Sequence, residues 1–90
     1  MIEISWALAG HGAGSATVET IDDAAAALGA AVCDAFADHD ADTVARVLHG
    51  VLGPLRMRLM TDGAFALEHG QRWESSEGPL LVTLRSVDSA

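Results

Sequence analysis

Several residue types are rare or missing in this chain. Its 90 residues contain no tyrosine, no lysine and a single cysteine, Cys33. One cysteine excludes an internal disulfide and is typical of a reducing compartment. With two tryptophans and two phenylalanines, leucine, valine and alanine have to fill the core. Half of the residues are hydrophobic, which suffices for one core and argues against disorder. We therefore expect a single domain over residues 1–90.

Long hydrophobic runs are also missing. Glu3 and Ser5 interrupt the apolar start of the chain, MIEISWAL, and no basic segment precedes it. This pattern predicts neither a signal peptide nor a membrane span. We therefore expect a cytoplasmic protein that does not bind membranes.

Positive charge is absent from the first half of the chain. Residues 1–45 contain eight acidic and no basic side chains, whereas residues 46–90 contain five of each. The net charge of −8 therefore comes from the first half. Such a surface repels phosphate backbones, which argues against direct nucleic-acid binding, and it attracts a basic protein. The alternative is that acidic charge only keeps a small protein in solution.

The stretch 20–38 has the strongest helical periodicity, and we expect the rest of the chain to pack on it. Thr20 is a typical N-cap, and Asp22 and Asp23 suit the positive end of the helix dipole. Cys33 lies beside the apolar stripe and is expected to be buried. The stripe consists of Ile21, Ala25, Leu28, Val32 and Phe36.

A strand and a glycine-rich turn precede this helix. Large and small side chains alternate over residues 2–8, which predicts a half-buried strand with Trp6 in the core. The following segment, 9–15, has the spacing G-x-G-x-G rather than G-x-G-x-x-G, and no Lys-Ser or Lys-Thr pair follows it. We interpret it as a hairpin turn with His11 at its solvated tip, and the second strand as starting near Ala16.

The acidic run DHDAD, residues 38–42, is similar to a calcium loop. The EF-hand pattern fails, because its sixth position is Thr43 rather than Gly and its twelfth is not Glu. We interpret Asp40 or Asp42 as the N-cap of a second helix over residues 41–52, which the following Gly-Pro pair ends.

Residues 55–69 predict a β-hairpin, because apolar and polar side chains alternate on both sides of an Asp-Gly pair. A three-residue loop at 61–63, with Gly63 in the left-handed conformation, places Leu59 opposite Phe65 on the core side.

The end of the chain predicts a loop and a strand. The polar segment 71–78 predicts a loop that contains Trp73. This side chain either anchors a protein interface or folds back onto the core. Residues 80–85 predict a central strand that is covered on both faces. The resulting order is ββααβββ, an α+β domain with a single mixed or antiparallel sheet and two helices on one face.

An opening hairpin, a capped helix and a closing Leu/Val strand together resemble the ubiquitin-like β-grasp arrangement. The resemblance lies in the order of the elements. Because no Gly-Gly pair follows Arg85, it implies no conjugation function.

These features favour a non-enzymatic protein-binding module, such as an inhibitor, an immunity protein or a regulatory subunit, that docks on a basic protein partner. No catalytic residue, metal site or cofactor is predicted. The expected partner-binding residues are Asp34, Asp38, Asp40, Asp42 and Trp73.

Two other classes remain open. A small enzyme or ligand-binding domain would use the four histidines, no two of which have the i, i+3 or i, i+4 spacing of a local metal site. A self-associating structural subunit, such as a homodimer, would pair through an exposed edge strand or the alanine-rich face of the first helix. The histidines are His11, His39, His49 and His69.

Overall fold

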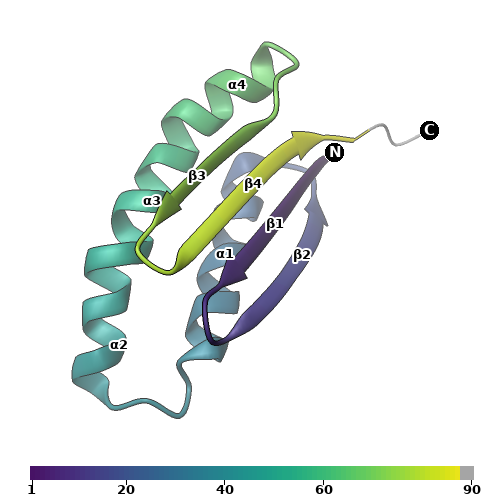
Figure 1. Ribbon diagram of the computed structural model, residues 1–90. Helices are drawn as coiled ribbons and strands as arrows, with labels where there is room; N and C mark the ends of the chain where they lie inside the picture. Colours follow the sequence, from purple (N-terminus) through teal and green to yellow (C-terminus); the bar gives the residue numbers. More distant parts are fainter. Residues whose placement is uncertain (88–90) are drawn as a thin grey trace.

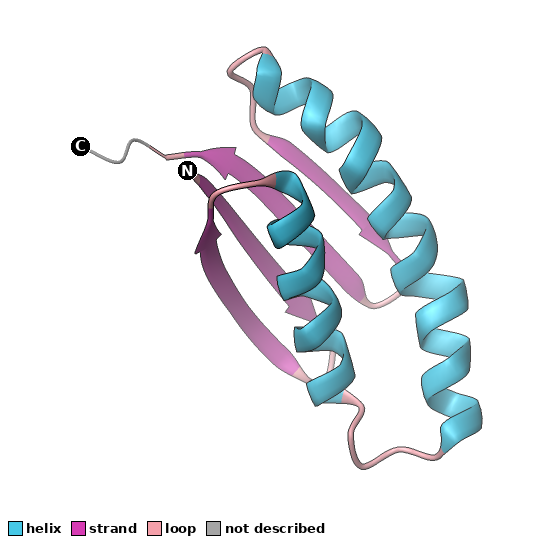
Figure 2. Ribbon diagram, turned by 180° about the vertical axis from the view of Figure 1, so that it is seen from behind, coloured by secondary structure: helices cyan, strands magenta, loops and turns pink. Residues whose placement is uncertain are grey.

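The computed structural model describes residues 1–87. Four strands form one antiparallel sheet in the order β2-β1-β4-β3. Both helical segments lie on the same face of this sheet (Figures 1 and 2). The expected α+β class, with one sheet and helices on one face, is thereby confirmed. The strands are β1 (Ile2–Leu8), β2 (Gly12–Val18), β3 (Trp73–Glu77) and β4 (Leu80–Ser86).

The predicted order ββααβββ contains one strand too many. The observed order is ββααββ, with one hairpin before the helices and one after them in the sequence. A β-grasp arrangement is not confirmed, because only the β3–β4 hairpin follows the helices in the described residues.

Helix α1 (Ile21–Ala35) begins as predicted. The Thr20 hydroxyl accepts a hydrogen bond from the Asp23 N–H at 3.1 Å, which satisfies one of the free donors of the first turn. Leu28 and Val32 from the predicted stripe are buried, but Cys33 is exposed, contrary to expectation. The helix therefore packs on the sheet through the predicted stripe.

The second helix does not end at Gly53-Pro54, and the predicted hairpin over 55–69 is wrong. One continuous helical segment runs from Ala41 to Glu68, with two π-helical turns within it. Its parts are α2 (Ala41–Val47), η1 (Leu48–Leu52), α3 (Gly53–Arg58), η2 (Leu59–Gly63) and α4 (Ala64–Glu68).

The first π turn accommodates the proline. The Gly53 N–H donates to the Leu48 carbonyl, five residues back, instead of the usual four. Pro54 then occupies the first turn of α3, where its missing N–H costs least. The Gly-Pro pair consequently alters the helix locally without ending it.

The conformation of Gly63 explains why the predicted hairpin over 55–69 is wrong. It has right-handed helical dihedrals, φ −65° and ψ −45°, and is buried. A Cβ at this position would lie 2.9 Å from Leu84 Cδ1 and 3.4 Å from Trp73 Cδ2. Gly63 thus permits close packing of the helix on β3 and β4 and does not form a turn. Phe65, predicted to face the core, is 62% exposed, and Met57 in the same segment is 71% exposed.

The sheet also differs from the prediction in two places. β2 starts four residues earlier than Ala16, and the expected loop over 71–78 contains β3. β4 is central as predicted, but only its helix-facing side is covered, because Leu81 on the other side is 41% exposed.

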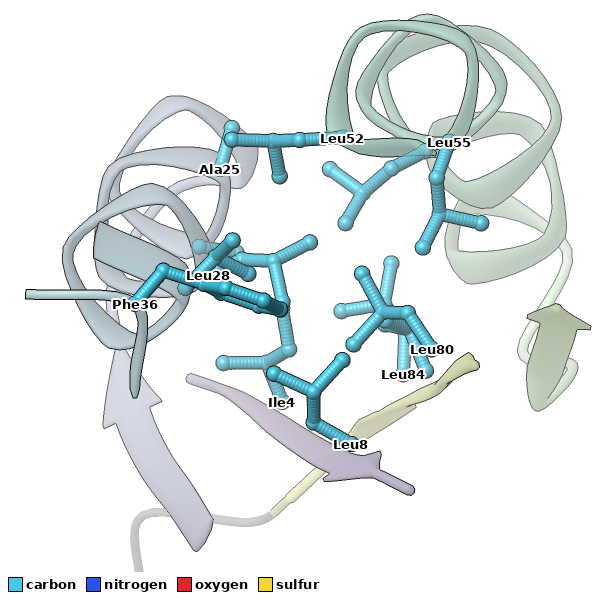
Figure 3. Close-up of a cluster of buried hydrophobic side chains, with 13 residues drawn as sticks. Ile4, Leu8, Ala25, Leu28, Phe36, Leu52, Leu55, Leu80 and Leu84 are labelled. Carbon is cyan, nitrogen blue, oxygen red and sulfur yellow. The ribbon is translucent and has the colours of Figure 1, made fainter. Parts of the chain in front are cut away.

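The core lies between the sheet and the two helical segments (Figure 3). The sheet contributes Ile4 and Leu84, α1 contributes Leu28, and the long helix contributes Leu55 and Leu59; all five are fully buried. Trp6 is half-buried against this core, as expected, and its ring lies against the backbone of Gly14.

Candidate acidic interaction site

Four of the five predicted partner-binding residues lie at the connection between α1 and α2. We call this surface the acidic junction and define it as Asp34, Asp38, Asp40 and Asp42. Asp34 is in the last turn of α1, Asp38 is in the connecting turn, and Asp42 is in the first turn of α2. All four side chains are exposed. The connection forms one end of the molecule (Figure 1).

Asp40 has a structural role within the junction. Its carboxylate accepts a hydrogen bond from the Thr43 N–H at 3.3 Å and so caps α2. The hydrogen bonding to Thr43 lowers the pKa of Asp40 below its ordinary value. This carboxylate therefore stays ionised at neutral pH while it holds the start of the helix.

An aromatic cluster ties the β1–β2 turn to the junction. The imidazole of His11 lies 4.5 Å from the Phe36 ring and 5.4 Å from the His39 ring, measured between centroids. Phe36 and His39 are 4.9 Å apart. Phe36 is buried, whereas both histidines are exposed. No local pattern in the sequence indicates this cluster, because His11 is distant in the chain from the other two rings.

Trp73 is not part of the acidic junction. It is the first residue of β3, half-buried, and it packs against Gly63 and the core. The start of β3 and the α1–α2 connection lie at opposite ends of the molecule (Figure 1). The structure therefore does not bring Trp73 together with the four aspartates, and the placement corresponds to the predicted alternative that it folds back onto the core.

The arginines leave most of the acidic first half unpaired. Arg85 binds Glu3 at 2.7 Å, which lowers the pKa of Glu3. Arg58 binds Glu77 and Arg72 binds Glu74, so these two pairs lie within the second half of the chain. Within residues 1–87, Glu3 is the one carboxylate of the first half in a salt bridge.

The unpaired carboxylates of the first half form two groups, at opposite ends of α1. One group is the acidic junction, near which Arg46 lies one helical turn after Asp42. The other group precedes or begins α1 and consists of Glu19, Asp22 and Asp23. The unpaired carboxylates of the first half are therefore concentrated at two places.

His69 lies outside the aromatic cluster of His11 and His39. His69 is the C-cap residue of α4 and stacks on Phe65, so it does not lie on a strand of the predicted 55–69 hairpin. A small hollow of about 70 Å³ lies between the β1–β2 hairpin and α1. His11 is its one titratable lining residue, beside apolar residues that include Trp6 and Ala35.

No group of three or more histidine, cysteine, aspartate or glutamate side chains in residues 1–87 is arranged to hold a metal ion. None of the helices in that range is long and apolar enough to cross a membrane. Comparisons of the chain with protein-family models, curated proteins and solved structures gave no match.

Proposed function

We propose that this chain is a small non-enzymatic binding module that docks its acidic junction on a basic protein partner. Inhibitors, immunity proteins and regulatory subunits are the functional classes that this proposal includes. The observation that supports it is that four exposed carboxylates lie around the α1–α2 connection. Within residues 1–87, no arginine forms a salt bridge with any of them.

The electrostatics of the junction suit a cationic surface. The chain carries a net charge of −8, and an excess of one sign at an exposed site speeds the approach of an oppositely charged protein. The carboxylates of Asp34, Asp38 and Asp42 make no hydrogen bond within the described residues, so they are available to a partner's arginine or lysine side chains. Arginine can bind a carboxylate through two parallel N–H···O bonds.

The aromatic cluster adds contact area to this surface. His11 and His39 are exposed at the α1–α2 connection, where their rings pack on Phe36, and guanidinium groups stack on flat rings. Because the rings rest on buried Phe36, the partner would meet a surface whose shape is set by the core. In protein interfaces aromatic side chains are enriched at the buried core, whereas charged side chains gather at the polar rim.

Affinity capture from an extract of the source cells tests the proposal with a charge-matched control. The test variant replaces Asp34, Asp38 and Asp42 with asparagine and leaves Asp40, the helix cap, unchanged. The control variant removes three charges at the other end of α1: Glu19→Gln, Asp22→Asn and Asp23→Asn.

We expect the wild type and the control variant to retain the same basic protein, eluted by salt, and the test variant to lose it. Equal capture by all three proteins would refute the junction as the binding site. Equal loss with both variants would show that total charge, and not the junction, is responsible.

A further inference from the structure

Two large apolar side chains on the long helix remain exposed to solvent. Met57 is 71% and Phe65 is 62% exposed. They are eight residues apart in the sequence. The second π turn, in which the Ala64 N–H donates to the Leu59 carbonyl five residues back, adds one residue to the helix between them. The other seven residues make two ordinary turns, so both side chains lie on the same outer face of the helix.

The surroundings of these two side chains keep this face apolar and ordered. Thr61 lies between them, and its hydroxyl donates to the Met57 carbonyl at 2.9 Å. The Phe65 ring stacks on the imidazole of His69, with 4.2 Å between centroids. We call Met57, Thr61 and Phe65 the outer patch. Because its ring is already held in place, Phe65 loses little conformational entropy when another surface covers it.

Charges of opposite sign flank the outer patch. Arg56 directly precedes Met57, and Glu68 follows Phe65 by three residues, so both lie on the same side of the patch, at its two ends. Both side chains are exposed, and neither is in a salt bridge within residues 1–87. They are about three turns, or about 16 Å, apart along the helix, which is too far for an ion pair with each other.

We propose that a second copy of this chain covers the outer patch, with the two long helices antiparallel about a two-fold axis at Thr61. In this register Met57 packs on Phe65 of the second copy, and the contact occurs twice by symmetry. A thioether against an aromatic ring is a favourable contact. Arg56 lies about 3 Å along the helix axis from Glu68 of the second copy, on the same side of the interface, so the two form an ion pair.

Charge complementarity favours a second copy as the occupant and selects the antiparallel direction. Antiparallel helices bring the basic end of each outer patch to the acidic end of the other, which gives two equivalent ion pairs. Parallel helices would instead place Arg56 beside Arg56 and Glu68 beside Glu68. Charged pairs flank the apolar seam of a coiled coil in the same way and set the orientation of its helices.

The proposed dimer leaves the acidic junction free. Asp42 is 19 residues before Thr61, or about 28 Å along the helix. The two junctions therefore lie at opposite ends of the dimer, separated by much more than the Debye length of about 8 Å at physiological ionic strength. Each copy contributes one short patch, which is less than a standard interface, so we expect a dissociation constant in the micromolar range or above.

Sedimentation velocity from micromolar to millimolar concentration tests the inference with two charge reversals. Arg56→Glu and Glu68→Arg each bring like charges together at both symmetric contacts, so each variant alone should have a dissociation constant raised at least about tenfold. An equimolar mixture of the two should dimerise like the wild type, because each reversed residue then faces an opposite charge. The reversals change the net charge in opposite directions, so total charge alone would not weaken both.

A matched pair of truncations tests the apolar part of the contact. Phe65→Ala and Leu81→Ala each remove an exposed apolar side chain, and Leu81 lies on the face of the sheet away from the helices. We expect Leu81→Ala to dimerise like the wild type. Phe65→Ala should raise the dissociation constant at least about tenfold, because it removes an aromatic side chain from the centre of the interface.

A wild type that stays monomeric at millimolar concentration would overturn the inference. A mixture of the two charge variants that associates no better than either alone would overturn it as well. Dimers that Leu81→Ala disrupts and Phe65→Ala does not would place the contact on the open face of the sheet instead. All four variants keep the acidic junction, and no measurement uses a basic partner, so these results are independent of the proposed function.

Discussion

Replacing glycines in the long helix with alanine should have opposite effects at two positions. Gly50 and Gly63 both lie in its π-helical turns. A Cβ at Gly50 meets nothing within 4 Å, whereas a Cβ at Gly63 lies 2.9 Å from Leu84 Cδ1. The two substitutions are chemically identical, so a difference between them reports the packing of the helix on the sheet.

The expected magnitudes follow from these surroundings. Alanine in place of a helical glycine stabilises by about 0.5–1 kcal/mol, and we expect this gain for Gly50→Ala. At Gly63 the same gain is opposed by overpacking, which costs about 1–3 kcal/mol. Leu84 is fully buried and has little room to move. We therefore expect Gly63→Ala to lower the free energy of unfolding by about 1–2 kcal/mol.

Thermal and urea unfolding followed by circular dichroism measure both effects. In a domain of this size, 1 kcal/mol shifts Tm by about 4–8 °C, so the two variants should move Tm in opposite directions. Gly63→Ala should lower the urea concentration at the midpoint of unfolding without changing the slope of the unfolding free energy against urea concentration. A Gly63→Ala protein as stable as Gly50→Ala would refute close packing of the helix against Leu84 and Trp73.

Three further substitutions test other parts of the fold. Thr20→Ala should lower the free energy of unfolding by about 1 kcal/mol in thermal unfolding, because it removes the cap of α1; an unchanged Tm would contradict that role. Leu59→Ala should cost about 2–5 kcal/mol in urea unfolding, because the side chain is fully buried; a loss as small as that of an exposed residue would contradict its position in the core. Arg85 lowers the pKa of Glu3, so the stability that Glu3 contributes over Glu3→Gln should be present at neutral pH and disappear as acid protonates the carboxylate. Unfolding measured from pH 7 to about pH 3 checks this, and a difference that grows in acid would contradict the sign.

The elements that the sequence predicted correctly are those with one dominant signal. The stripe and the cap of α1 agree with each other, and the alternation of residues 2–8 fits only a strand. Residues 55–69 satisfied two periodicities at once. Leu55 and Leu59 are one helical turn apart and also share a strand face, so local pattern could not decide between the two.

The errors have a common physical cause in tertiary packing. Gly63 resembles a turn residue in sequence, but close contact with Leu84 is what requires a glycine there. The polar segment that contains β3 forms a strand because β4 supplies its hydrogen-bond partners. Of the predicted site, the sequence placed the four aspartates together at one helix junction. It could not foresee that Trp73 lies at the other end of the molecule.

The central claim, that the acidic junction docks on a basic protein, is tested most directly by the salt dependence of the association rate. The captured partner, once purified, is bound to the wild type at low and at high ionic strength, and the variant with Asp34→Asn, Asp38→Asn and Asp42→Asn is measured beside it. We expect the wild-type association rate to fall at least about tenfold with salt, and the variant to associate slowly at both. A wild-type rate that salt leaves unchanged, or a variant that associates as fast as the wild type, would contradict the claim.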